Sequence, residues 1–334
     1  YVHIRLMSMH APDTPMAAFL EALRAAAEPT RLRIMAICAA GEWTVSELTQ
    51  VLGQSQPRVS RHLKVLAEAG LLERFREGTW VFYRLADRDG RVAARLVELV
   101  PDSAEFALDR RRLEEVRAER RRKAQAYFDR QALGWERVRE LTVADDEVDR
   151  AVLTLIDQDP PASLLDIGTG TAHVLRTLAP RIGYGLGIDL SFDMLAVARA
   201  NLEAAGVANC QVRHGDMYQL PVADGAFSCA VLHQVLHFAE TPAAAIGEAT
   251  RALAPGGRLL VVDLAPHEDE TLRQEFRHRR LGFADAEMRG WFEHAGLEAG
   301  AVHHLPGKVA ATVIWEARRP GVAVHSRLQG SAVA

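Results

Sequence analysis

The hydrophobic and polar positions divide the 334-residue chain into two regions with different periods. In the first hundred residues, apolar side chains recur three or four positions apart, which is typical of short amphipathic helices. This pattern predicts helices at residues 17–27, 29–40, 44–51 and 58–69, separated by glycine, proline or capping residues. Two alternating runs follow at residues 71–76 and 79–84, and they predict a β-hairpin.

The helices and the hairpin together predict a winged helix-turn-helix domain. Thr44, followed three residues later by Glu47, predicts a capping box at the start of the third helix. In the fourth helix, Val59, Leu63 and Leu66 share one face and are expected to pack inward. Polar side chains on the other face and on the hairpin are expected to contact bases and phosphates of DNA. They are Ser55, Gln56, Arg58, Ser60, Arg61, His62, Lys64, Arg74, Arg76 and Arg84.

Two motifs in this region resemble the ArsR family of bacterial repressors. They are EPTRLRI at residues 28–34 and SRHLKVL at residues 60–66. The resemblance covers residues 15–90 and implies a homodimer that binds a double-stranded DNA operator. Metal-sensing members of the family carry a cysteine pair on the helix before the recognition helix, whereas residues 44–50 hold no cysteine and no histidine. We therefore expect no metal sensor in this domain.

From residue 145 onward, short apolar runs alternate with amphipathic segments. This alternation predicts a doubly wound parallel sheet with helices on both faces, an α/β Rossmann-like fold. Residues 91–100 predict one more helix, and residues 109–122 predict a highly charged one. The expected segments are 1–13, disordered or of extraneous origin; 14–100, the DNA-binding domain; 101–123, a charged helical linker; 124–319, the α/β domain; and 320–334, a flexible tail.

The run LLDIGTGT at residues 164–171 carries the strongest functional signal. It predicts a buried strand, a glycine turn where a ligand can approach the backbone closely, and the N-terminus of a helix. Asp189 ends the next predicted strand, 23 residues after Asp166, a spacing typical of a carboxylate that binds ribose hydroxyls. His173 stands where a dinucleotide-binding motif has its third glycine, which disfavours a pyrophosphate ligand.

The D-x-G-x-G pattern resembles the first motif of the class I S-adenosylmethionine-dependent methyltransferases. Five later blocks extend the resemblance: HGDM at 214–217, LP at 220–221, AFSCAVL at 226–232, LAPGGR at 253–258 and LLVVD at 259–263. The resemblance implies S-adenosylmethionine or S-adenosylhomocysteine as the cofactor. It implies the following pocket: Gly168, Thr169 and Gly170 at the methionine moiety, Asp189 at the ribose, Leu190 and Met217 around the adenine, Asp216 at its amine, and Asp166, Met194, Gly215, His233 and Gln234 nearby.

The catalytic residues stay open at this point. His233 and His237 are expected on one face of a helix, where they could hold a base or two metal ligands. Other candidates for the acceptor side are Asp263, His267, Arg273, His278 and Arg279. No carboxylate or thiol at a recognisable spacing completes a metal site, so we expect no metal. Arsenic methylation would require clustered nucleophilic cysteines, whereas Cys210 and Cys229 lie in or beside apolar runs.

Composition adds few constraints. A net charge of −4, with 49% hydrophobic and 25% charged residues, is ordinary for a globular protein and excludes a uniformly basic nucleic-acid binder. No apolar run approaches the ~18 residues that a membrane span requires. The three cysteines are far apart in sequence, so we expect a bacterial cytoplasmic protein without disulfides.

Two functions follow from these patterns. The first is an ArsR-type transcriptional regulator, expected to be a repressor of methionine or S-adenosylmethionine-cycle genes, whose DNA binding depends on S-adenosylmethionine or S-adenosylhomocysteine. The alternative is an active methyltransferase of a small-molecule acceptor that carries a regulatory helix-turn-helix. The sequence favours the first, because no group of residues typical of a particular acceptor stands out.

Overall fold

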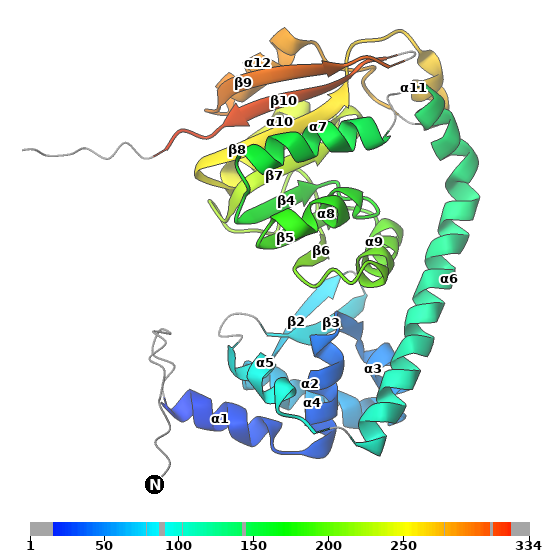
Figure 1. The fold of residues 1–334 in the computed structure, drawn as a ribbon, viewed down its shortest axis with the longest axis vertical. Coiled ribbons are helices and arrows are strands. Elements are labelled where there is room, and N and C mark those ends of the chain that lie inside the picture. The colour runs from blue at the N-terminus through cyan, green and yellow to red at the C-terminus, as the bar shows by residue number, and fades with distance from the viewer. Residues whose placement is uncertain are drawn as a thin grey trace, which may run out of the picture. The chain divides into compact units, whose positions relative to one another are not determined.

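The computed structural model describes residues 16–77, 79–86, 91–101, 103–141, 145–276, 278–307 and 310–321 (Figure 1). The chain forms two compact units that divide between Glu119 and Arg120. The predicted N-terminal segment 1–13 and residues 322–334 of the predicted tail lie outside the described residues. None of the described helices is both long enough and apolar enough to cross a membrane.

The first unit contains helices and a small sheet. Its elements are α1 (Met16–Ala26), α2 (Pro29–Ala39), β1 (Trp43–Thr44), α3 (Val45–Leu52), α4 (Gln56–Glu68), β2 (Leu72–Glu77), β3 (Trp80–Leu85) and α5 (Arg91–Glu98). The three strands are antiparallel in the order β1-β3-β2. The predicted winged helix-turn-helix is therefore confirmed, with α3 and α4 as the two helices and the β2–β3 hairpin as the wing.

Local signals in the sequence explain these boundaries. The predicted capping box is present, because Thr44 Oγ1 accepts from the Glu47 backbone N–H and Glu47 accepts from the Thr44 N–H at 2.8 Å. Gly53 then ends α3 in the left-handed conformation with φ +63°. Val59, Leu63 and Leu66 of α4 are fully buried, as predicted.

The charged helix α6 (Ala104–Leu141) begins in the first unit and continues past the division between the units. Leu113 and Val116 are buried in the core of the first unit, so this charged helix has a narrow apolar face. Asp109 is also buried, and its carboxylate accepts two hydrogen bonds of 2.6 Å from the Arg33 guanidinium on α2.

The second unit contains a seven-stranded sheet in the order β6-β5-β4-β7-β8-β10-β9, in which β10 runs antiparallel to both of its neighbours, β8 and β9. Its strands are β4 (Ser163–Ile167), β5 (Tyr184–Asp189), β6 (Cys210–His214), β7 (Phe227–His233), β8 (Leu253–Leu264), β9 (Glu298–Leu305) and β10 (Thr312–Arg318). Its helices are α7 (Asp145–Gln158), α8 (His173–Leu178), α9 (Phe192–Ala204), α10 (Pro242–Ala252), α11 (Glu270–Phe276) and α12 (Asp285–His294), with short 3-10 turns η1 (Ala179–Arg181) and η2 (Leu236–Phe238).

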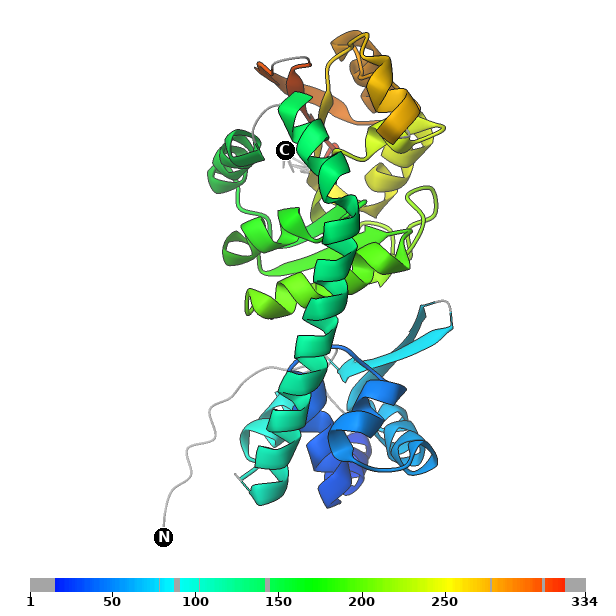
Figure 2. The same ribbon diagram turned by 90° about the vertical axis from the view of Figure 1, so that its right-hand side faces the viewer.

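Helices cover both faces of this sheet, as the predicted doubly wound fold requires. Neighbouring residues of β4 show the alternation: Leu164 packs with α7, α8 and α9, whereas Leu165 packs with α10 and α12. In Figure 2 the green α7 and the orange α12 lie on opposite sides of the sheet. The carboxyl ends of the parallel strands form one edge, where ligands of such folds bind.

Candidate functional site

The glycine turn between β4 and α8 is built around a buried acid. Asp166 is 1% exposed, and its Oδ2 accepts a 2.6 Å hydrogen bond from the Thr169 hydroxyl. Burial raises the pKa of Asp166 to about 7. Its Oδ1 is buried and has no hydrogen-bond partner among the described residues. An acceptor atom of this kind usually has a partner in a complete site.

Both glycines of the turn adopt the left-handed conformation, with φ +74° at Gly168 and +53° at Gly170. A Cβ at Gly168 would lie 2.2 Å from the Val235 side chain, so the backbone of the turn directly contacts the segment that follows β7. A Cβ at Gly170 would meet nothing within 4 Å. The turn therefore keeps open space beside Gly170, where a ligand can reach the backbone.

Asp189 lies opposite this open space. Its Oδ2 accepts from the Gly170 backbone N–H at 2.9 Å, and its Oδ1 accepts from the Ser191 N–H at 2.8 Å. Burial raises the pKa of Asp189, and these N–H donors partly counteract that effect. A carboxylate has about four acceptor sites, more than these backbone donors occupy, so Asp189 can accept a further hydrogen bond from a ribose hydroxyl of an adenosyl compound. The residues present thus fit that group.

The other predicted cofactor residues lie along the ends of β5 and β6. Leu190 is 64% exposed, Met194 is on the first turn of α9, and Asp216 is exposed and accepts from the Tyr218 N–H. Gly215 has no room for a side chain, because a Cβ there would lie 2.7 Å from Pro221. Met217 is half-buried against the core beneath the sheet edge.

A pair of stacked rings at the ends of β5 and β6 is absent from the sequence predictions. The Phe192 and His214 rings stack with their centroids 4.1 Å apart and 7° between their planes. Phe192 is 40% exposed, so the stacked pair adds a flat surface beside Leu190. The sequence carries a signal for this pair: Phe192 follows Leu190 by two residues, and His214 directly precedes Gly215 at the end of the neighbouring strand.

A second polar group lies where β7 and β8 end. The prediction that His233 and His237 share a helix face is wrong: His233 is the last residue of β7, Gln234 turns with φ +51°, and His237 lies in η2. His237 is buried instead, and its Nδ1 lies 2.8 Å from Asp263 Oδ1. The His278 ring stacks on it at 3.8 Å.

Of the other acceptor-side candidates, Arg273 and Arg279 point elsewhere. Arg273 is on α11 and pairs with Glu270 at 2.9 Å, whereas Arg279 lies 3.8 Å from Glu240 near the surface. The part of the chain that the structure describes contains no group of three or more histidine, cysteine or acidic side chains able to hold a metal ion.

The predicted DNA contacts fall into two sets. Most of them are exposed: Ser55, Gln56, Arg58, Ser60, Arg61 and Lys64 on or before α4, and Arg74 and Arg76 on β2. Two differ from the prediction. The His62 side chain is only 15% exposed and lies 3.5 Å from Glu28, and the 16%-exposed Arg84 side chain is held by Glu73 and Glu42. Both face carboxylates of their own domain rather than solvent.

Comparison with known proteins agrees with both halves of this description. Residues 26–74 match a family model for a helix-turn-helix domain, and residues 165–261 match one for a methyltransferase domain. Demethylmenaquinone methyltransferase of Thermus thermophilus is 33% identical over 169 residues, which cover 48% of this chain and 72% of the relative. Arsenic resistance transcriptional regulator ArsR1 of Pseudomonas putida is 52% identical over 60 residues, which cover 18% of this chain and 47% of the relative.

The chain belongs to the class I methyltransferases and carries an ArsR-type helix-turn-helix domain. A third relative, arsenite methyltransferase of Aquipseudomonas alcaligenes, is 36% identical over 132 residues, which cover 36% of this chain and 38% of the relative. The chain thus spans less than half the length of two of these three relatives.

The three cysteines of this ArsR–methyltransferase chain are all buried and carry free thiols. Burial raises the pKa of Cys210 to about 12 and that of Cys229 to about 11, and it raises the pKa of Cys38 further. A thiol with so high a pKa is a poor nucleophile and metal ligand at neutral pH.

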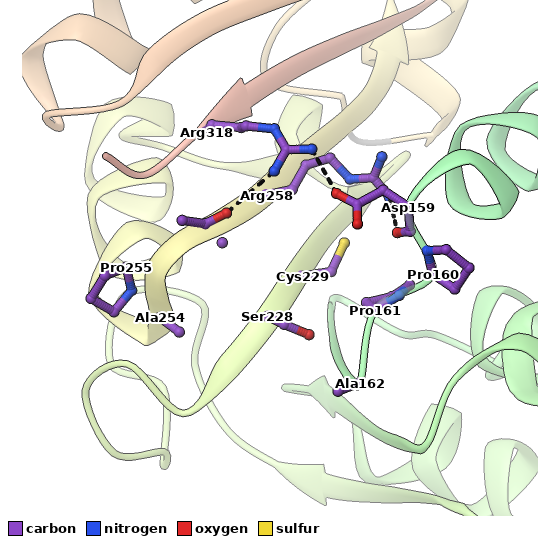
Figure 3. Close-up of a pocket in the computed structure, with 12 residues that line it drawn as sticks. Asp159, Pro160, Pro161, Ala162, Ser228, Cys229, Ala254, Pro255, Arg258 and Arg318 are labelled. Carbon is purple, nitrogen blue, oxygen red and sulfur yellow. Dashed lines mark hydrogen bonds and ion pairs between the residues drawn. The ribbon is translucent and has the colours of Figure 1, made fainter. Parts of the chain in front are cut away.

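A cavity of about 240 Å³ opens at the other edge of the methyltransferase sheet, where the parallel strands begin (Figure 3). Arg318 pairs there with Asp159 at 2.6 Å, and Arg258 donates to the Leu155 and Asp159 carbonyl oxygens. None of the predicted cofactor residues lines this cavity. The glycine turn and Asp189 at the carboxyl edge are therefore the cofactor site to consider.

Proposed function

We propose that this protein is an ArsR-type transcriptional regulator, a repressor of methionine or S-adenosylmethionine-cycle genes, whose operator affinity depends on S-adenosylmethionine or S-adenosylhomocysteine. The observation that carries the proposal is the open space beside Gly170, next to an Asp189 carboxylate that accepts from the Gly170 N–H and has acceptor capacity left. A regulator that senses an adenosyl compound requires a binding site for that compound linked to a DNA-binding helix.

Each cofactor group has a matching place in the methyltransferase domain. Asp189 would accept hydrogen bonds from the ribose hydroxyls, and the open space beside Gly170 leaves room for the methionine part. The exposed Leu190 and the Phe192–His214 stack would cover the flat adenine. When bound, S-adenosylmethionine supplies a methyl group activated by a sulfonium.

The DNA-binding half relies on α4 and the wing. Arg58, Arg61 and Lys64 are exposed on α4, where guanidinium groups can read guanine edges and an ammonium can bind phosphate. Members of the family that act as repressors bind two half-sites as a homodimer, and we propose the same assembly here. The ligand then acts by linkage, because it shifts the population towards the conformation that it binds more tightly.

The test is operator affinity in three ligand states. An operator is first selected from random-sequence DNA with the purified protein, and its binding is then measured by fluorescence anisotropy with S-adenosylmethionine, with S-adenosylhomocysteine and with neither. We expect at least one ligand to change the affinity by about fivefold or more, the usual lower range of allosteric coupling. Equal affinity in all three states would contradict the sensor.

Two variants locate the effect. Asp189→Asn should abolish the ligand dependence and keep the ligand-free operator affinity, because it removes the charge that binds the ribose and leaves α4 untouched. The matched control is Asp193→Asn, which changes an exposed acid in the first turn of α9. This variant should respond to the ligand as the unmodified protein does.

Methyl transfer to a small molecule is the second candidate function. The observation that favours it is the buried group of His237, Asp263 and His278, which lies at the carboxyl edge of the sheet and which cofactor binding does not require.

A further inference from the structure

A pair formed by His237 and Asp263 lies at the ends of β7 and β8. Asp263 is fully buried, its Oδ1 lies 2.8 Å from His237 Nδ1, and its Oδ2 accepts from the His237 backbone N–H at 3.2 Å. Asp263 therefore fixes both the ring and the backbone of His237. The His237 side chain is 4% exposed, so the ring is held in one orientation.

The hydrogen bond determines which nitrogen of His237 carries the proton. Burial acts to raise the pKa of Asp263, but the neighbouring His237 and the hydrogen bonds lower it below its ordinary value. Asp263 is thus a carboxylate, which can only accept, and His237 Nδ1 must donate to it. In the neutral ring, Nε2 then carries the free lone pair, as in a general base oriented by an acid.

His278 completes the group from the other side. His278 is 4% exposed, and its ring stacks on that of His237 with 19° between the planes. Burial and the neighbouring His237 lower the pKa of His278 to about 3, so His278 is neutral near pH 7. Its Nδ1 is buried without a hydrogen-bond partner among the described residues, and so is Nε2 of the nearby His267. Buried nitrogens of this kind point to a ligand that supplies the missing partner.

The group is close to the cofactor turn. The Val235 side chain is the one that a Cβ at Gly168 would meet at 2.2 Å, and His237 is two residues further along the same segment. Phe238, which is 44% exposed, has its ring centroid 4.2 Å from that of His237. His237 thus lies in the segment that contacts the glycine turn, and the exposed Phe238 ring beside it is the part of this group that an acceptor would meet first.

We propose that His237, oriented by Asp263 and covered by His278, is the general base that removes a proton from the methyl acceptor. The inference rests on the second candidate function. As the acceptor oxygen or sulfur attacks the methyl carbon of S-adenosylmethionine, its proton passes to His237 Nε2. The carbon–sulfur bond breaks with its electron pair left on sulfur, which yields S-adenosylhomocysteine and a histidinium paired with Asp263.

The chemistry of the base selects a class of acceptor. Proton transfer is most efficient when the base and the acid have similar pKa values, and an imidazole matches a weakly acidic group. Thiols and phenols fit this range, whereas an alkyl alcohol is too weak an acid. The Phe238 ring favours an aromatic acceptor over a charged one. We infer that the acceptor is a phenol or a thiol.

The test measures formation of S-adenosylhomocysteine from S-adenosylmethionine, with catechol and dithiothreitol as the two probes. We expect turnover with at least one probe and a rate that rises with pH to a plateau. His237→Gln should lower kcat by about 10²-fold or more and leave the KM for S-adenosylmethionine within a few fold. Added imidazole should restore part of the rate of His237→Ala, which a purely structural role would not allow.

The titratable groups that face His237 are Asp263 on β8, His267 after β8 and the neutral His278. NMR of ¹⁵N-histidine protein gives a readout independent of turnover: His237 should carry its proton on Nδ1, and Asp263→Asn should change that tautomer. A His237 protonated on Nε2 would overturn the proposal.

A matched control uses a similar pair outside the site. His304 lies 3.0 Å from Asp285, and both are exposed, so His304→Gln should leave turnover unchanged. Calorimetry with S-adenosylhomocysteine separates the two possible failures. If the protein binds it but neither probe is methylated, or if His237→Gln retains full kcat, this inference fails and the sensor stands. If it does not bind at all, the proposed function fails.

Discussion

Asp166 shows how burial sets the state of a single residue at the cofactor turn. An acid that is 1% exposed, with one oxygen bonded to Thr169 and the other without a partner among the described residues, has a pKa of about 7. Its ordinary value is about 4, so between about pH 4 and pH 7 the folded protein holds a proton there that the unfolded chain has released.

This difference predicts a pH dependence of stability. Because folding raises the pKa of Asp166, the protonated carboxyl contributes to the free energy of unfolding at low pH. This contribution is lost as the pH rises from about 4 to about 7 and changes little above that. Asp166→Asn should remove this dependence. In urea unfolding, the free energy of unfolding of the variant, relative to that of the unmodified protein, should therefore increase as the pH rises across this range. Parallel pH profiles for the two proteins would contradict the raised pKa.

Gly168 gives a second prediction at this scale. Gly168→Ala would place a Cβ against the Val235 side chain and would also force an alanine into the left-handed backbone conformation of Gly168. The two effects together should destabilise the methyltransferase domain by more than about 2 kcal/mol. The matched control, Gly247→Ala on α10, has an ordinary φ and open space, and it should stabilise by about 0.5–1 kcal/mol. Thermal unfolding measures both. Equal melting temperatures would show that Val235 moves aside freely.

At the scale of elements, α4 combines a buried and an exposed face. Val59, Leu63 and Leu66 fix the helix to the core, and this leaves Arg58, Arg61 and Lys64 in solvent. Position along the helix alone suggests that His62 also faces DNA, whereas the structure turns it towards Glu28 at the N-cap of α2.

Two substitutions on adjacent residues test this arrangement. If Arg61 contacts a base, Arg61→Ala should weaken operator binding by about 1–3 kcal/mol. If Arg61 binds a phosphate, the variant should instead reduce the slope of log K against log salt concentration by about one. His62→Asn should leave both quantities nearly unchanged, because its ring contacts Glu28. Anisotropy titrations at several salt concentrations measure the two effects. A larger loss for His62 than for Arg61 would reverse the assignment.

The sequence predicts elements well where the signals are local. The capping box at Thr44, the hairpin around residue 77 and the strand–turn–helix at residues 164–171 each depend on neighbouring residues. The acceptor-side group depends on contacts across the sheet, since His237 and Asp263 are 26 residues apart. Those residues could be named as candidates, but their pairing follows from the parallel register of β7 and β8, which no local pattern encodes.

At the scale of the whole molecule, two units with separate cores share one helix. The core of the first unit includes Leu113 and Val116 of α6, and the buried pair of Arg33 and Asp109 adds a bidentate contact between α2 and the same helix. Because α6 continues past Glu119, residues of this one helix belong to both units.

This arrangement predicts two linked thermal transitions. S-adenosylhomocysteine at about 100 times its dissociation constant should stabilise the methyltransferase unit by about 2.7 kcal/mol. If the units are coupled, the ligand should also shift the transition of the DNA-binding unit, and operator DNA should shift both by the reciprocal amount. Differential scanning calorimetry measures these shifts. Independent transitions would mean that the two units bind their ligands without communication.

The burial of all three native thiols has a practical consequence for measuring such coupling. Maleimide dyes require an accessible thiolate, so the unmodified protein should remain unlabelled. Cysteines introduced at two exposed positions, Ser46→Cys in one unit and Glu293→Cys in the other, would then be the only sites that accept fluorophores. Energy transfer between the two dyes would report, molecule by molecule, how operator and adenosyl compound change the distance between the halves.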